Sequence, residues 1–181
     1  MSEFREGRME ELEELYQFYE DVCAFQSRDQ YGPSWTIGIY PCREDLQQRL
    51  QNHEMYLLKE EGRIASAMVL TDQEDPDYLD TEFPSHARPE EVMVLHLFAV
   101  HPQFRGRHLS EFMLKEMIHL AEKRNKKAIH LDVIMGNYRA EWLYEKMGFQ
   151  IAEKRKVVYE DIGEQTAILM EYQISESVLP E

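Results

Sequence analysis

The chain has 181 residues, of which 43% are apolar and 11% aromatic, and it carries a formal net charge of −15. This length and apolar content predict one globular domain with a substantial core and argue against a disordered chain. The negative charge argues against nucleic-acid binding, which needs a basic face to neutralise phosphates. It would suit a cationic substrate, although an acidic surface also simply favours solubility.

Other patterns narrow the cellular setting. No apolar run approaches ~18 residues, so no membrane span is expected. The first residues, MSEFREGRMEELEE, are acidic and lack the apolar segment of a secretory signal. Cys23 and Cys42 have neither metal-ligand nor disulfide spacing. We therefore expect a reduced, cytoplasmic protein without a metal site.

The N-terminal part predicts two helices separated by a loop. Residues 8–25 place apolar side chains at three-to-four spacing, which is typical of an amphipathic helix, and residues 43–52 predict a shorter one. Glycine and proline make the connecting residues 26–41 a loop. Its aromatic residues Tyr31, Trp35 and Tyr40 could line a pocket or close the edge of the core.

The rest of the chain mixes strands and helices. Apolar runs of strand length cover residues 54–61, 63–71, 92–100, 128–135, 149–159 and 166–174. Helical periodicity covers residues 109–124 and 138–147, and Gly148 follows as a natural C-terminal cap. The acidic, proline-containing segment 72–91 predicts a long loop of the kind that often serves function. This order predicts an α/β fold with a mixed central sheet of six to seven strands flanked by helices.

Residues 92–110, VMVLHLFAVHPQFRGRHLS, are the stretch around which the chain is organised. His101 and Pro102 end the apolar strand, and a basic turn, 103–108, leads into the helix that starts at Leu109. Backbone N–H groups and a helix N-terminus therefore meet at one place, which favours binding of an anion.

Three blocks carry a resemblance to a known family: LHLFAVHPQFRGRHLS (95–110), HLDVIMGN (130–137) and AEWLYEKMGF (140–149). Together they resemble the GCN5-related N-acetyltransferase (GNAT) superfamily, in a small bacterial-type form with a single domain over residues 1–181. The family's signature turn, Gln/Arg-x-x-Gly-x-Gly/Ala, falls on Gln103, Arg105, Gly106 and His108. His108 and Ser110 depart from it, because glycine is common at both positions and lets the backbone approach a pyrophosphate. The histidine ring must point outward, give up some of that contact, or add a contact of its own.

The resemblance implies that an acetyl group moves from acetyl-CoA to a primary amine by direct attack on the thioester, with no metal. The backbone of Phe98 and Val100 would pair with the pantetheine arm in a slot between splayed strands, and an N–H in this stretch would stabilise the oxyanion. The implied pyrophosphate contacts are Arg105, Gly106, Arg107, His108, Leu109 and Ser110. Asn137 would contact pantetheine or simply cap the next helix.

Two residues are candidates for proton transfer. Tyr144 stands where family members carry the tyrosine that protonates the coenzyme A thiolate, although it could be an ordinary interior tyrosine of an amphipathic helix. His96 is the candidate base, because some members carry a histidine in the same Leu-His-x-x-Ala-Val context and an imidazole of pKa ~6.5 suits the task. On a two-residue period His96 should share a strand face with Phe98 and Val100. It could equally be a satisfied core histidine.

Two classes of function thus remain open at this point: an N-acetyltransferase, or a non-catalytic acetyl-CoA-binding or regulatory module. An acyltransferase that uses a longer acyl group differs from the first only in the depth of its pocket. The acceptor would be a small-molecule or peptide amine, bound among Trp35, Tyr40, the loop 72–91 and the end of the chain. Neither nucleic acid nor membrane is an expected partner, and a homodimer is a further possibility suggested by the family.

Overall fold

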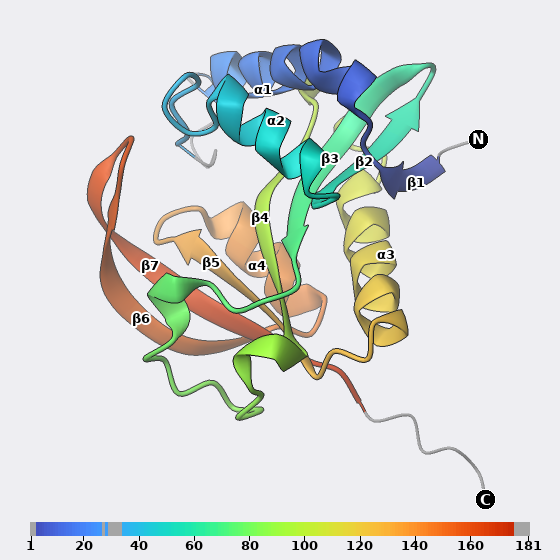
Figure 1. Ribbon diagram of the computed structural model, residues 1–181. Coiled ribbons are helices and arrows are strands. Elements are labelled where there is room, and N and C mark those ends of the chain that lie inside the picture. The colour runs from blue at the N-terminus through green and yellow to red at the C-terminus, as the bar shows by residue number, and fades with distance from the viewer. Residues whose placement is uncertain (1–2, 27, 29–33, 176–181) are drawn as a thin grey trace, which may run out of the picture.

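The computed structural model describes residues 3–26, 28 and 34–175, which form one seven-stranded sheet with helices on both faces (Figure 1). The strand order is β1-β2-β3-β4-β5-β7-β6, and only the β4–β5 pair is parallel. The helices are α1 (Leu12–Gln26), α2 (Arg43–Gln51), α3 (Leu109–Lys123) and α4 (Tyr138–Lys146). The strands are β1 (Glu3–Glu6), β2 (Met55–Glu60), β3 (Arg63–Thr71), β4 (Val92–Val100), β5 (Ala128–Ile134), β6 (Gln150–Tyr159) and β7 (Gly163–Gln173).

The predicted mixed sheet and the predicted order of elements are confirmed. The edge strand β1 was not expected, because four residues with glutamate at both ends carry no apolar alternation. Its formation depends on pairing with β2, from Glu3 opposite Lys59 to Glu6 opposite Tyr56. Tyr31, one of the predicted pocket residues, lies outside the described residues. None of the described helices is both long and apolar enough to cross a membrane.

Each face of the sheet has its own core. Helices α1 and α2 bury Leu15, Tyr19 and Leu46 against one face, together with Leu57 and Val69 from the sheet. Helices α3 and α4 pack on the opposite face, where the fully or almost fully buried residues include Met68, Met93, Met113, Met117, Leu131 and Tyr144. The methionines of α3 are therefore core residues, as their spacing predicts.

The parallel strands β4 and β5 separate after a short paired stretch. They pair only at Val92–Val94, which lie opposite Ala128–His130. Beyond this point β4 stays paired with β3 and β5 stays paired with β7, so the two strands diverge (Figure 1). The slot between splayed strands that the family resemblance implies is thus present in the fold.

A β-bulge at Leu97 changes the direction of the side chains in β4. Ala67 lies opposite Ala99 but Val69 lies opposite His96, so β4 has one extra residue, and Leu97 has the left-handed φ of 49°. The expectation that His96 shares a face with Phe98 and Val100 is wrong for this reason. Phe98 and Val100 pack with the α3–α4 core, whereas His96 points to the other face and approaches Asp75.

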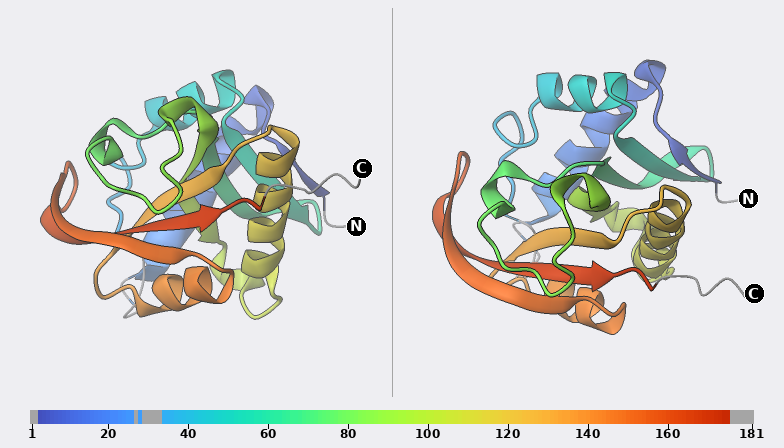
Figure 2. Two further views of the ribbon diagram at one scale, coloured as in Figure 1. Left: turned by 90° about the horizontal axis from the view of Figure 1, so that it is seen from below. Right: turned by 60° about the horizontal axis from the view of Figure 1, so that its bottom comes forward.

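The segment 72–91 is a long loop, as predicted, and it packs across β5 and β7 (Figure 2). Its buried residues Tyr78 and Phe83 pack with Val92, Val94 and Leu169 of the sheet. This cluster lies on the same face of the sheet as α1 and α2, but at a different place along it. The long β6–β7 hairpin curls away from the sheet, and its tip accepts a hydrogen bond from Thr36 N at Asp161 Oδ2, 3.0 Å away. The loop and the hairpin thus enclose the open end of the slot.

Candidate active site

A cavity of about 320 Å³ lies where β4 and β5 diverge. Residues 95–98 and 131–134 of the two strands form its inner walls, and α4, the loop 72–91 and the β6–β7 hairpin complete it. His96, Phe98, Asn137 and Tyr144 line this cavity together, as do Trp35 and Tyr40. Val100 and the turn 105–110 lie outside it, at the end of β4 and the start of α3.

Tyr144 reaches the cavity from α4 and is 7% exposed. Its ring packs edge-on against Phe149, with 5.5 Å between the ring centroids. Burial raises the pKa of Tyr144 well above its usual value of 10, and the charge of Asp132 adds to the effect. The phenol therefore stays protonated near neutral pH, which is the state that a proton donor needs.

His96 reaches the same cavity from the opposite face of the sheet, with 15% of its side chain exposed. Its Nε2 lies 3.7 Å from Asp75 Oδ2. Burial lowers the pKa of His96 below 6.5, although the charges of Asp75 and Asp132 partly oppose the shift. Most of the imidazole is then neutral at pH 7, which is the state that can accept a proton.

Asp132 is a cavity residue that the motifs did not single out. Its carboxylate accepts a hydrogen bond from Tyr78 of the loop and another, 2.5 Å long, from Tyr159 of β6. Burial is the main cause that raises the pKa of both phenols, and the Asp132 charge raises it further. The sequence did offer one sign of this residue, since Asp132 is a single carboxylate within the otherwise mostly apolar strand 128–135. Ionised groups in such strands are seldom buried without partners.

The cavity is strongly acidic on the side that faces the loop and the hairpin. Its lining includes five carboxylates: Asp75, Asp77, Asp132, Glu160 and Asp161. No lysine or arginine is among the described residues that line it. Five negative groups in a partly enclosed space favour a positively charged guest, because the low local dielectric strengthens their field.

The turn after β4 has the geometry of an anion site. His101 is buried and organises the turn: its Nδ1 accepts from Gln103 N at 3.2 Å and its Nε2 lies 3.0 Å from Asp21 Oδ2. Gly106 has a φ of 79° and His108, the N-cap of α3, a φ of 59°. The side chain of His108 is 84% exposed and lies 3.6 Å from Glu111. Its ring thus points outward, and the N-terminal N–H groups of a 15-residue helix remain accessible beside it.

The two arginines of the turn are anchored on aromatic rings. The Arg105 guanidinium lies 4.7 Å from the ring centroid of Phe25, and that of Arg107 lies 5.0 Å from the centroid of Phe104. Arg107 also pairs with Glu61 at 2.9 Å and with Glu60 at 3.3 Å. Part of its charge is therefore already balanced, and a phosphate would have to share it with these glutamates.

The backbone of Phe98 and Val100 faces the slot. His101 N donates to Ala65 O of β3 at 2.9 Å. Because the peptide groups of successive strand residues point to opposite sides, those of Val100 and Phe98 point away from β3 and towards the gap beside β5. Asn137 lies at the other wall, where its Oδ1 accepts from Ala140 N at 3.3 Å and caps α4. The cap role is thus present, and the amide nitrogen of the side chain is the part available to a ligand.

Comparison with known proteins identifies the family. The profile of the "Acetyltransferase (GNAT) family" matches residues 10–149. A protein of Bacillus subtilis (strain 168) named "Putative [ribosomal protein bS18]-alanine N-acetyltransferase" is 33% identical over 71 residues, which are 39% of this chain and 47% of that relative. The chain thus matches about half the length of this curated relative.

Solved structures share the fold along the whole chain. The ribosomal-protein-S18-alanine N-acetyltransferase of Escherichia coli superposes with a TM-score of 0.71 at 21% identity, over 98% of this chain and 96% of that one. A GNAT-family acetyltransferase of Streptococcus agalactiae reaches 0.74 at 19% identity, over 97% and 96%. A Salmonella typhimurium protein with its cofactor acetyl-CoA reaches 0.66 at 15% identity, over 100% and 98%. Since the family profile also covers well over half of the chain, the protein belongs to the acetyltransferase (GNAT) family, as its three sequence blocks imply.

Proposed function

We propose that this protein transfers the acetyl group of acetyl-CoA to a primary amine by direct attack of the amine on the thioester. The observation that carries the proposal is the cavity between β4 and β5. It joins His96 and Tyr144 to a strand whose backbone faces an open slot. Membership of the acetyltransferase family supports the same reaction. We also propose that the protein acts in the cytoplasm, and its two free cysteines, Cys23 and Cys42, support a reducing setting.

Acetyl-CoA fits the geometry from the turn to the cavity. The N-terminus of α3 and the backbone of residues 105–110 would hold the pyrophosphate, with Arg105 and Arg107 adding charge. The peptide groups of Phe98 and Val100 would pair with the pantetheine arm, and Asn137 would donate to it from the other wall. This path brings the thioester to the cavity, where an N–H of the Phe98–Val100 backbone would stabilise the oxyanion.

Two proton transfers complete the reaction. His96 takes a proton from the attacking amine, directly or through water, because burial keeps its imidazole neutral. A bond forms between the amine nitrogen and the acetyl carbon, and the bond from that carbon to sulfur breaks. Tyr144 gives its proton to the leaving thiolate and regains one from solvent. Asp132 is the competing base on the same cavity, but both of its carboxylate oxygens already accept hydrogen bonds, one from Tyr78 and one from Tyr159.

We propose that the acceptor is a cationic amine, either a small molecule or the end of a peptide. The five carboxylates of the cavity support a substrate that carries positive charge beyond the reacting nitrogen. Two of the similar proteins are named for acetylating the alanine of a ribosomal protein, so a peptide α-amino group is a specific candidate. Diamines and basic peptides should therefore be better acceptors than acidic peptides of equal length.

The second candidate is a module that binds acetyl-CoA without catalysis. Two observations favour it: His108 stands in a position usual for glycine, and Arg107 is already paired with Glu60 and Glu61. It predicts acetyl-CoA binding with no transfer to any amine.

The deciding experiment measures release of free coenzyme A with a panel of diamines, aromatic amines and short basic or acidic peptides. Acetyl-CoA binding is followed in parallel by calorimetry. We expect transfer to cationic amines, a loss of about 100-fold in kcat for Tyr144→Phe with acetyl-CoA affinity kept, and a fall in rate only as the pH drops below 6.5. Binding without transfer to any amine would support the module instead. A pH–rate profile that His96→Ala leaves unchanged would remove the histidine from the mechanism.

A further inference from the structure

A buried polar cluster lies beside the cavity, at the point where β4 and β5 separate. His130 is opposite Val94 in the last pair that joins the two strands, and it is 1% exposed. Its ring stacks on Phe83 of the loop 72–91, with 3.5 Å between the centroids and 14° between the planes. A histidine with no contact to solvent and no place in the proposed reaction calls for an explanation.

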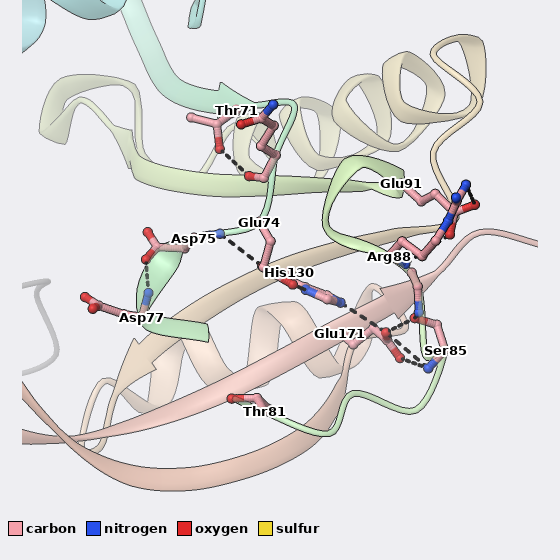
Figure 3. Close-up of polar contacts among 12 residues, drawn as sticks. Thr71, Glu74, Asp75, Asp77, Thr81, Ser85, Arg88, Glu91, His130 and Glu171 are labelled. Carbon is pink, nitrogen blue, oxygen red and sulfur yellow. Dashed lines mark hydrogen bonds and ion pairs between the residues drawn. The ribbon is translucent and has the colours of Figure 1, made fainter. Parts of the chain in front are cut away.

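Both ring nitrogens of His130 face carboxylates (Figure 3). Nδ1 lies 2.6 Å from Glu74 Oε2, and Nε2 lies 3.1 Å from Glu171 Oε1. Glu171 also accepts from Ser85 N at 2.9 Å and from Gln173 Nε2 at 3.2 Å. Because ionised carboxylates only accept hydrogen bonds, both nitrogens of His130 must carry protons, and the ring is an imidazolium.

The electrostatics agree with this assignment. Burial on its own would lower the pKa of His130, but the hydrogen bonds to Glu171 and Glu74 outweigh it and raise the pKa above 6.5. Burial would likewise raise the pKa of Glu171, yet the hydrogen bonds from His130 and Ser85 lower it. The three side chains thus form a charged unit that links β5, β7 and two points of the loop.

The cluster continues into the wall of the cavity. The second oxygen of Glu74, Oε1, accepts from Asp75 N at 3.2 Å. Asp75 in turn accepts from Asp77 N at 2.8 Å and starts the short 3-10 turn Pro76–Tyr78 (Figure 3). That turn places Asp75, Asp77 and Tyr78 at the wall of the cavity. Asp75 Oδ2 lies 3.7 Å from His96 Nε2, and the Tyr78 hydroxyl donates a hydrogen bond to Asp132.

We propose that His130 is a positioning residue for the amine acceptor. Held between Glu74 and Glu171, it fixes the segment 74–85 on the sheet and thereby places the carboxylates of Asp75 and Asp77 at the cavity. This inference rests on the proposed function, because the acceptor is taken to bind on that wall. The acetyl-CoA contacts come from the β4 backbone and the α3 turn, so His130 should govern acceptor binding and leave acetyl-CoA binding intact.

The test compares His130→Gln and Glu74→Gln with Arg88→Gln as the matched control. Arg88 belongs to the same loop, but it is exposed and pairs only with Glu90 and Glu91 among the ion pairs of the described residues. Glu74→Gln keeps the size of the side chain but removes its charge and one of the two oxygens that accept from His130 Nδ1 and Asp75 N, so it tests the proposal even if His130→Gln folds poorly.

Three readouts are measured on each full-length variant. Hydrogen exchange of segment 74–87 should accelerate about tenfold or more in the two cluster variants, since charge-assisted hydrogen bonds are lost, while α3 stays protected. The KM of the amine should rise about tenfold with the acetyl-CoA Kd unchanged, and Arg88→Gln should match wild type in all readouts. Nitrogen NMR of His130 in wild type should show both ring nitrogens protonated at pH 7.

The proposal is overturned by a neutral His130 at pH 7, or by cluster variants whose loop exchange and amine KM stay at wild-type values. An accelerated loop with an unchanged amine KM also refutes the positioning role. Absence of transfer by the wild type would instead overturn the proposed function. The NMR and exchange results would still decide whether the cluster holds the loop.

Discussion

The hydroxyl of Tyr19 offers a sharp test of how the bulge in β4 is maintained. Tyr19 comes from α1, is fully buried, and donates to Leu97 O at 2.6 Å. Burial raises its pKa well above 10, so it remains a donor at any ordinary pH. Leu97 itself has a left-handed φ of 49°, which a branched side chain adopts only when its surroundings enforce it.

Replacing Tyr19 with phenylalanine removes one hydroxyl and leaves a buried carbonyl without this donor. An unsatisfied buried acceptor costs about 1–3 kcal/mol. For a domain of this size that corresponds to a fall in Tm of roughly 2–12 °C. Since Leu97 precedes the Phe98 backbone, we also expect kcat to fall at least about tenfold, because small displacements of reacting groups are costly.

The assays are urea unfolding and steady-state transfer to the best acceptor of the panel. Tyr16→Phe is the matched control, since Tyr16 is also on α1 but only partly buried, with its ring against Arg43. It should change the free energy of unfolding by less than about 0.5 kcal/mol. Equal losses for the two variants would refute the idea that the Tyr19 hydroxyl supports the bulge. If Tyr19→Phe loses stability while its kcat is unchanged, the geometry of the bulge does not control catalysis.

Two further predictions concern His108 and the His130 cluster. His108→Gly relieves the left-handed backbone strain of the folded state but raises the conformational entropy of the unfolded chain. The two effects oppose each other, so Tm should change by less than about 2 °C. The acetyl-CoA Kd should not weaken, because the ring points outward, and a tenfold weaker Kd in calorimetry would contradict this. The cluster should protect the Ser85 amide best between pH 4.5 and 6.5, after correction for intrinsic exchange. The stabilisation from protonated His130 is lost as the pH rises through its raised pKa. The stabilisation from ionised Glu171 is lost as the pH falls through its lowered pKa. Protection of the Ser85 amide that stays constant from pH 4 to 9 would disprove this dependence on the two side chains.

Local and contiguous features of this protein could be predicted from its sequence. The turn 103–108 is an example, because a strand, a glycine and a helix start are encoded within a few neighbouring residues. The helix 109–124 and the strand 128–135 follow from apolar periodicity alone, and their observed bounds differ from the prediction by one residue. Even the outward ring of His108 was one of the alternatives that its position allowed.

Features that depend on distant partners could not be predicted in this way. Asp132 has its role through Tyr78, 54 residues away, and His130 through Glu171, 41 residues away. Leu97 gave no local sign of a bulge, since a leucine there looks like part of a regular strand and only a glycine would have suggested otherwise. The prediction that His96 shares a face with Phe98 is wrong for this reason, because one extra residue moves every preceding side chain to the opposite face of the sheet.

The bulge also explains how one strand can serve two substrates. Had β4 kept a strict two-residue period, His96 would point to the α3–α4 core with Phe98, far from the acidic wall. The extra residue turns His96 towards Asp75 on the proposed acceptor side, while the peptide groups of Phe98 and Val100 still face the proposed slot for acetyl-CoA. A left-handed leucine costs about 1–3 kcal/mol. The hydrogen bond from Tyr19 to Leu97 O offsets part of this cost. In return, the strained residue lets the proposed base, His96, and the proposed thioester site at Phe98 lie close together along the chain.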